Sequence, residues 1–139
     1  MKDNNLDDPR TARARASFAT VAYAKLLGLE LGEVSEGVAT VHLPVRDELR
    51  QNRGVVHGGA VASLIDTAAA FALLSKIGLD QRVTTTDLTI HYLRPISTGR
   101  LTATAQIVRA GRRLFVVSVE VTNEQKLVAT AVTSYLAIG

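Results

Sequence analysis

The first apolar pattern of the chain has the spacing of a helix. Asp8-Pro9 suits an N-cap followed by proline in the first helical turn, and apolar residues then recur at helical spacing. Gly28 can end this segment. We therefore expect an N-terminal helix over residues 9–28, preceded by a disordered tail over residues 1–8.

The second helical segment is the most apolar stretch of the chain. Residues 58–76 are rich in alanine and leucine, contain no proline and are followed by Gly78. These features predict a helix. Because apolar residues run nearly all the way round it, we expect this helix to be buried on most sides.

The remaining apolar residues follow the period of two that is typical of strands. One such segment, residues 38–43, precedes the apolar helix, and four follow it at residues 87–92, 101–107, 117–122 and 127–138. The breaks between the last four are short, which favours antiparallel hairpins. This order predicts an α+β fold, with one curled antiparallel sheet wrapped around a long central helix in a single domain over residues 1–139.

Composition narrows the class of protein. The 139 residues include no cysteine, which excludes disulfides, thiolate metal sites and a cysteine nucleophile, so we expect a cytoplasmic protein. The three histidines have no metal-ligand spacing, and we expect no metal site. The charged residues that give the net charge of +3 are scattered along the chain, and aromatic residues are few. Both features argue against nucleic-acid binding. We identify no targeting segment and no stretch long enough to span a membrane.

One charged residue interrupts the apolar helix. Asp66 lies between Ile65 and Thr67, and burying an unpaired carboxylate is costly. Such a residue has either a structural partner, such as Ser63 or Thr85, or a chemical role.

The start of the same helix has a second unusual feature, the run His57-Gly58-Gly59. A helix N-terminus presents free N–H groups, and glycine lets a ligand approach the backbone closely. This chemistry suits the oxygen of a thioester carbonyl as it becomes an oxyanion. A tight turn before the helix explains the two glycines equally well.

The combination resembles a known family. Gln51-Asn52-Arg53-Gly54-Val55-Val56-His57-Gly58-Gly59, followed by Leu64-Ile65-Asp66, is similar to the signature of hotdog-fold acyl-CoA thioesterases of the PaaI-like type, within the 4-hydroxybenzoyl-CoA thioesterase superfamily. The likeness runs from about Leu29 to the C-terminus. It implies a hotdog fold and hydrolysis of an acyl-CoA to a carboxylic acid and CoA, without a cofactor.

The resemblance also implies roles for individual residues. Asp66 matches the family's catalytic carboxylate, which acts as general base or as nucleophile. Gly58 matches the glycine whose backbone N–H polarises the thioester carbonyl. Gln51 falls where the family carries an amide near the thioester, and Asn52 takes that place if the loop is shifted by one residue. Thr85 falls where some members carry a hydroxyl that orients water.

Two further groups of residues are candidates for the site. We expect His57 to fix the start of the helix rather than to transfer protons. Gly59 and the hairpin arginines Arg109, Arg112 and Arg113 are candidates for binding CoA, because guanidinium groups suit its phosphates. A solvated turn explains these arginines equally well.

The spacing of Gly58 and Asp66 predicts how the chains assemble. Eight residues of helix span about 12 Å, whereas a thioester carbonyl must lie within about 3–4 Å of both an oxyanion donor and the attacking group. Two antiparallel helices from two chains can bring Gly58 of one to Asp66 of the other. We therefore expect a homodimer with shared active sites, and hotdog proteins often pair again into homotetramers.

Two alternative functions stay open at this point. A hotdog dehydratase or hydratase acting on acyl thioesters would need an acid and a base near the β-carbon, and His57 is available for that. A non-enzymatic sensor that binds acyl-CoA is the other alternative. The presence of Asp66 argues against a sensor.

Overall fold

A computed structural model describes residues 8–138 of the chain. The N-terminal segment forms two helices, α1 (Pro9–Phe18) and α2 (Ala22–Leu27), so the single helix expected over residues 9–28 is wrong. The first helix ends at Phe18, shortly before Thr20 and Val21, whose β-branched side chains disfavour a helix, and Val21 has an extended backbone. Most of the tail expected over residues 1–8 lies outside the described residues, whereas Asp8 is ordered as the N-cap of α1.

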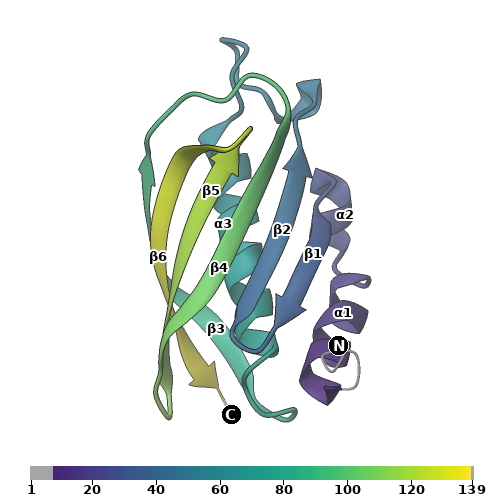
Figure 1. Cartoon of the computed structure of the whole chain (residues 1–139), viewed down its shortest axis with the longest axis vertical. Coiled ribbons are helices and arrows are strands. Elements are labelled where there is room, and N and C mark those ends of the chain that lie inside the picture. The colour runs from purple at the N-terminus through teal and green to yellow at the C-terminus, as the bar shows by residue number, and fades with distance from the viewer. Residues whose placement is uncertain (1–7, 139) are drawn as a thin grey trace.

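Six antiparallel strands form one curled sheet, with α3 (Gly58–Leu74) behind it in Figure 1. The order across the sheet is β1-β2-β4-β5-β6-β3, and a short 3-10 helix, η2 (Asp47–Leu49), lies between β2 and α3. The strands are β1 (Glu30–Ser35), β2 (Val38–Pro44), β3 (Arg82–Tyr92), β4 (Arg100–Ala110), β5 (Leu114–Asn123) and β6 (Lys126–Ile138). The predicted α+β class with a curled sheet around a central helix is confirmed.

The pattern of alternation missed β1. Only Val34 in this strand is buried, and the pairing with β2 is irregular between Leu31 and Val34. An edge strand with one buried residue has too few core positions to show a period of two.

Hairpins were expected at every short break after α3. They occur between β4 and β5 and between β5 and β6, but β3 pairs with β6 and β4 pairs with β2. The expected hairpin between β3 and β4 is therefore wrong. Residues 93–99 instead carry the chain across the upper end of the sheet in Figure 1, and Pro95 in this segment cannot donate a backbone hydrogen bond to a ladder.

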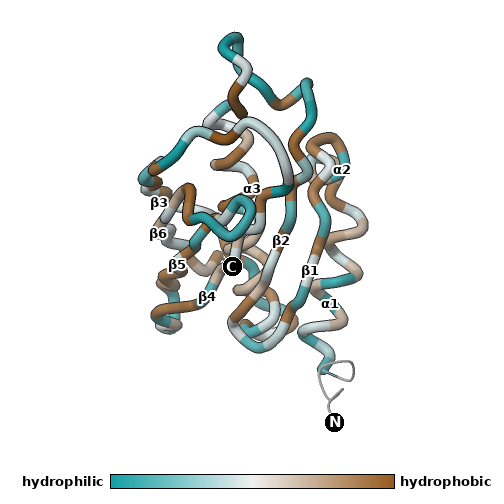
Figure 2. The backbone as a smooth tube through the Cα atoms, turned by 45° about the horizontal axis from the view of Figure 1, so that its top comes forward, coloured by the Kyte–Doolittle hydropathy of each residue, from teal (hydrophilic) through white to brown (hydrophobic). Residues whose placement is uncertain are grey.

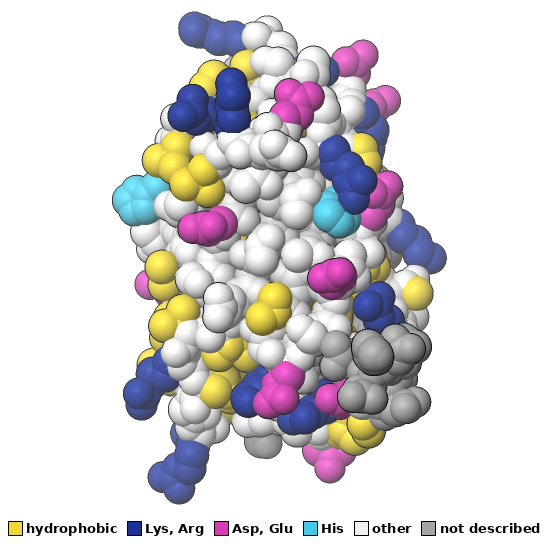
Figure 3. All heavy atoms as spheres, in the orientation of Figure 1, with side chains coloured by type: hydrophobic (Ala, Val, Ile, Leu, Met, Phe, Trp, Pro, Cys, Tyr) yellow, Lys and Arg dark blue, Asp and Glu magenta, His cyan; other side chains and the backbone are white. Residues whose placement is uncertain are grey.

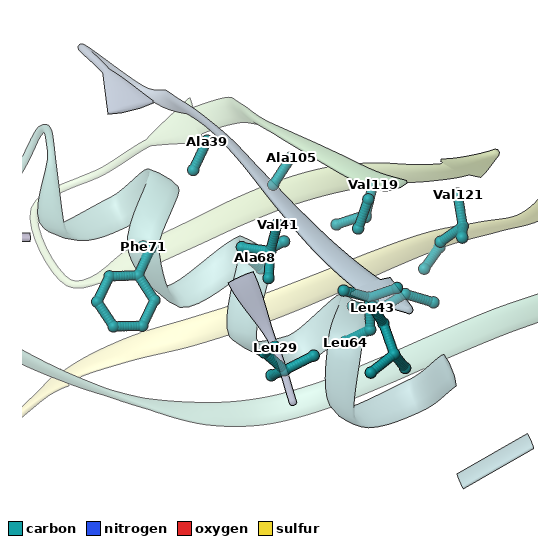
Figure 4. Close-up of a cluster of buried hydrophobic side chains, with 14 of the residues drawn as sticks. Leu29, Ala39, Val41, Leu43, Leu64, Ala68, Phe71, Ala105, Val119 and Val121 are labelled. Carbon is teal, nitrogen blue, oxygen red and sulfur yellow. The ribbon is translucent and has the colours of Figure 1, made fainter. Parts of the chain in front are cut away.

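The core lies between α3 and the inner face of the sheet. Figure 4 shows Leu64 and Ala68 of α3 meeting Val41, Leu43 and other strand residues, and the hydrophobic colours in Figure 2 follow α3 and the strands. Burying a side chain such as Leu64 contributes roughly 1.5–3 kcal/mol. One stripe of α3 stays partly exposed, and it includes Ser63, Asp66, Thr67, Ala70 and Leu74. Burial on most sides of α3 is thus confirmed, and the exposed stripe is the one that carries the carboxylate.

The end of α3 is held by α1. Arg13 donates hydrogen bonds to the carbonyl of Leu74, which the helix end leaves unpaired, and to those of Ile77 and Gly78 just after the helix. Phe18 packs edge-on against Phe71, with ring centroids 5.2 Å apart. These contacts fix α1 against the C-terminal end of α3.

The outward face of the sheet offers no single-sign patch. Figure 3 shows charged side chains of both signs scattered over it. Among residues 8–138, no helix is long and apolar enough to cross a membrane, and no cluster of potential metal ligands occurs.

Candidate active site

Asp66 is held by two hydroxyl groups from the sheet. The Tyr135 hydroxyl donates a hydrogen bond of 2.7 Å to Oδ1, and the Thr85 hydroxyl donates one of 3.0 Å to the same oxygen. Ser63, named above as a possible partner, bonds instead to the Gly59 carbonyl and to Tyr23. Within the described residues Oδ2 accepts no hydrogen bond, so half of the carboxylate is available to a ligand.

A β-bulge aims Thr85 at the helix. Thr85 pairs with Tyr135 across β3 and β6, and the register shifts between Thr85 and Asp87. Strand residues an odd number apart normally point to opposite faces, and an extra residue reverses this. The bulge therefore lets Thr85 face Asp66 while Tyr92, seven residues later, also faces α3.

An apolar pocket begins at Asp66. It has a volume of about 510 Å³ and runs along the exposed stripe of α3 toward the end of that helix. Its apolar lining comes from Val21, Ala70, Phe71, Leu74, Val83 and Ile138. A carboxylate with one free oxygen thus stands at the wall of a space that suits an apolar group.

The start of α3 has an unused N–H group. His57 is the N-cap, and its Nδ1 accepts a hydrogen bond of 2.8 Å from the Gly59 N–H. The Ala60 N–H is bound by the His57 carbonyl, whereas the Gly58 N–H donates to no acceptor within residues 8–138. His57 therefore fixes the helix start. The N–H of Gly58, and not that of Gly59, is available to donate a hydrogen bond to a ligand.

Gln51 lies near this free N–H. Gln51, Gly58, Tyr92 and Arg94 line one surface depression of about 360 Å³. Tyr92 donates a hydrogen bond of 2.8 Å to the Gly58 carbonyl and packs its ring over that glycine. Asn52 lies in the exposed turn outside the depression, whereas Gln51 lines it.

The two groups of residues do not meet within one chain. Asp66 and Thr85 line the pocket, whereas Gly58 and Gln51 line the depression, and no residue is common to both. About 12 Å of helix separates Gly58 from Asp66. We call Gly58 with Gln51 the first half-site of the chain and Asp66 with Thr85 the second half-site.

The hairpin arginines lie far from the glycines. Arg109, Arg112 and Arg113 are exposed around the turn between β4 and β5, at the lower end of Figure 1, whereas α3 begins at the upper end. The structure does not bring them to Gly58, Gly59 or Gln51. Arg94 is the cation beside Gly58, and its position after β3 gave no local signal of this.

Tyr135 was also missed in the sequence. It lies 69 residues from Asp66 and is 2% exposed. An inward-facing tyrosine in an apolar strand does suggest a buried polar partner, because its hydroxyl needs one. Which partner it finds depends on the pairing of β3, β5 and β6.

Comparison with known proteins places the chain among thioesterases. The family model described as "Thioesterase superfamily" matches residues 53–130. Acyl-coenzyme A thioesterase PaaI of Escherichia coli is 37% identical over 81% of this chain and 79% of its own length. The medium/long-chain acyl-CoA thioesterase YigI of Salmonella typhimurium is 32% identical over 84% of this chain and 85% of its own length.

Solved structures agree with the sequence relatives. The structure of E. coli PaaI superposes with a TM-score of 0.87 at 34% identity, covering 94% of each chain. A conserved Pseudomonas aeruginosa protein, PA5202, superposes with a TM-score of 0.82 at 38% identity, covering 84% of this chain and 94% of that one. The hotdog fold and the PaaI-like resemblance predicted from the sequence are confirmed, and the chain belongs to the Thioesterase superfamily, whose members hydrolyse thioester bonds.

Proposed function

We propose that this protein hydrolyses an acyl-CoA to a carboxylic acid and CoA at two sites shared between two chains. The observation that carries the proposal is Asp66, which stands at the wall of an apolar pocket with Oδ1 held and Oδ2 free. A carboxylate in this setting can act on a thioester carbonyl as general base through water, or directly as nucleophile. Neither route needs a metal or a redox cofactor.

The oxyanion would bind at the helix start of the partner subunit. The free Gly58 N–H at the positive end of α3 suits the negative charge that develops on the thioester oxygen. The Gln51 amide lines the same depression, and in this proposal it binds the thioester beside the oxyanion. Thr85, already bonded to Asp66, can accept a hydrogen bond from the attacking water.

The edge of the sheet supports the twofold pairing. β3 is an edge strand of 11 residues with no partner on its outer side within the described chain, and such an edge readily pairs with another strand. Thr85 contacts Asp66 near one end of β3, and Tyr92 contacts Gly58 at the other. Antiparallel pairing of two β3 strands about a point midway between these residues would set each Asp66 beside the partner's Gly58. A homotetramer built from two such dimers stays a prediction.

The apolar pocket points to the class of acyl group. Most of the surface that lines it is apolar and includes Phe71, while Gln81 and Arg82 also line it, so the pocket suits an aliphatic or aromatic acyl chain. The CoA part of the substrate would then extend out of the site along the depression that Arg94 lines. Arg112 and Arg113 remain the alternative phosphate site. The variant R94A and the double variant R112A/R113A distinguish the two sites. The variant that removes the phosphate site should raise KM for acyl-CoA but leave KM for a phosphate-free thioester unchanged.

The central experiment is a panel of acyl-CoAs of different acyl groups, with free thiol release measured for the natural chain and for Asp66→Asn. We expect cleavage by the natural chain and a fall in kcat of about 10³-fold or more in the variant, because asparagine keeps the shape but cannot act as base or nucleophile. Thermal unfolding of both proteins checks that the fold is kept. Binding of several acyl-CoAs without any cleavage would favour the sensor alternative. Conversion of a hydroxyacyl-CoA to an enoyl-CoA, or the reverse, without thiol release would favour the dehydratase or hydratase.

A further inference from the structure

Tyr135 donates a hydrogen bond to one oxygen of the Asp66 carboxylate, Oδ1, and not to the other. Its hydroxyl lies 2.7 Å from Oδ1 and 2.9 Å from the Asp66 backbone carbonyl oxygen. Thr85 donates to Oδ1 as well, at 3.0 Å. Both donors come from neighbouring strands at one register position, where Thr85 and Tyr135 pair. The rotation of the carboxylate is thus set from the sheet and not from α3.

The surroundings keep Tyr135 a donor. Burial raises the pKa of its hydroxyl far above the usual value, and the negative charge of Asp66 raises it further. The hydroxyl therefore keeps its proton throughout the pH range in which enzymes work. A donor that is always protonated and nearly fully buried gives Oδ1 a permanent partner.

We propose that Tyr135 is a positioning residue that, together with Thr85, immobilises Oδ1 and makes Oδ2 the reacting oxygen of Asp66. This role rests on the proposed thioesterase function. In the general-base route Oδ2 takes a proton from water as the water oxygen bonds to the thioester carbon. The C–S bond then breaks, and the departing CoA thiolate takes that proton. In the nucleophilic route Oδ2 bonds to the carbon, CoA thiolate leaves and is protonated from solvent, and water hydrolyses the anhydride to restore Asp66.

The same fixed carboxylate serves both routes. A carboxylate free to rotate would offer either oxygen in many directions, and holding the reacting group in one geometry is a large part of enzymatic rate enhancement. Loss of the Tyr135 hydroxyl should therefore reduce the rate of the chemical step more than the binding of substrate.

The test is Tyr135→Phe, which removes only the hydroxyl. Thiol release from a cleaved acyl-CoA should show kcat reduced about 10- to 100-fold with KM changed less than about threefold, as for a lost hydrogen bond to a charged group.

The matched control is Thr133→Val. Thr133 lies two residues away on β6, is 0% exposed and donates a hydrogen bond of 2.7 Å to the Asp87 carbonyl of β3, without touching Asp66. It should lose stability as Tyr135→Phe does, yet keep the kcat and KM of the natural chain. Equal kcat values for Tyr135→Phe and the natural chain, or equal losses in both variants, would overturn the positioning role while leaving the thioesterase function intact. Absence of cleavage by the natural chain would overturn both.

Discussion

The two half-sites of this chain are built from different materials. At the start of α3 the group proposed to bind the oxyanion is the backbone N–H of Gly58, beside the His57 cap and covered by Tyr92. In the middle of the same helix the proposed base or nucleophile is the Asp66 side chain, fixed by hydroxyls that reach it from β3 and β6. The first half-site depends on a local cap, whereas the second depends on strands that meet only in the folded sheet.

This difference explains how the two halves can cooperate. A helix start offers partial positive charge without a titratable group, and a mid-helix carboxylate offers negative charge that can accept a proton. Because about 12 Å of one rigid helix separates them, a single thioester can use both only if they come from different chains. The predictions below test that division, beginning with the largest effect.

Gly58→Pro removes the N–H of the first half-site and little else. Proline is favoured in the first helical turn, and the extended backbone of His57, with φ −64° and ψ 135°, suits a residue before proline. We expect kcat to fall about 10²- to 10³-fold, as for loss of one oxyanion donor. Thiol release is the measurement.

Gly58→Ala is the control for that prediction. It keeps the N–H, and its added Cβ would meet the Tyr92 ring at 3.4 Å, an ordinary contact. It should therefore retain most of the activity. If the alanine and proline variants lose activity equally, the backbone N–H is not what matters.

Mixing two inactive variants tests whether the half-sites are shared. A one-to-one mixture of Asp66→Asn and Gly58→Pro chains, allowed to exchange subunits, should recover about a quarter of the natural activity, because half of the dimers are hybrids with one intact site. The hybrids are counted with distinguishable tags. Hybrid dimers without activity would mean that each site is built within one chain.

Ala70→Phe tests the pocket that belongs to the Asp66 half-site alone. Ala70 lines the pocket one helical turn beyond Asp66, so a phenyl ring there should fill the space for longer acyl groups. We expect kcat/KM for long acyl-CoAs to fall about tenfold or more and that for acetyl- or butyryl-CoA to change little. A uniform loss for all chain lengths would count against this pocket as the acyl site.

Substitution of His57 should have the smallest effect of these variants. It should change the stability of the fold and not the rate of the chemical step. His57→Ala should lower the free energy of unfolding by about 1 kcal/mol through loss of the N-cap, whereas His57→Asn should keep the cap. Both should leave the pH dependence of kcat unchanged. Denaturant unfolding and a pH–rate profile measure these effects, and loss of a titrating limb in either variant would assign proton transfer to His57.

The sequence indicated the local features of both half-sites. Periodicity located α3 and five of the six strands, and Asp66 was visible as a charge in the middle of the most apolar stretch. The long-range features could not be predicted from the sequence. The pairing of β3 with β6, and with it the contact of Tyr135 with Asp66, arises from strands whose partners no local pattern specifies.

Thr85 shows this limit most clearly. Counting alternately back from Ile90 and Leu88 turns residue 85 away from the helix, and only the bulge turns it inward. Its candidacy therefore came from family resemblance, since the period of the strand pointed the other way.

The bulge makes the active site depend on the number of residues as well as on their identity. Deleting Thr86 would leave a continuous β3 able to pair with β6, yet every residue before it would turn over, and Thr85 would face solvent instead of Asp66. A lineage could lose the chemistry of this site through one codon while keeping the fold and Asp66 itself. When sequences of this kind are sorted into active and inactive members, the spacing between residues 85 and 88 deserves as much weight as the aspartate itself.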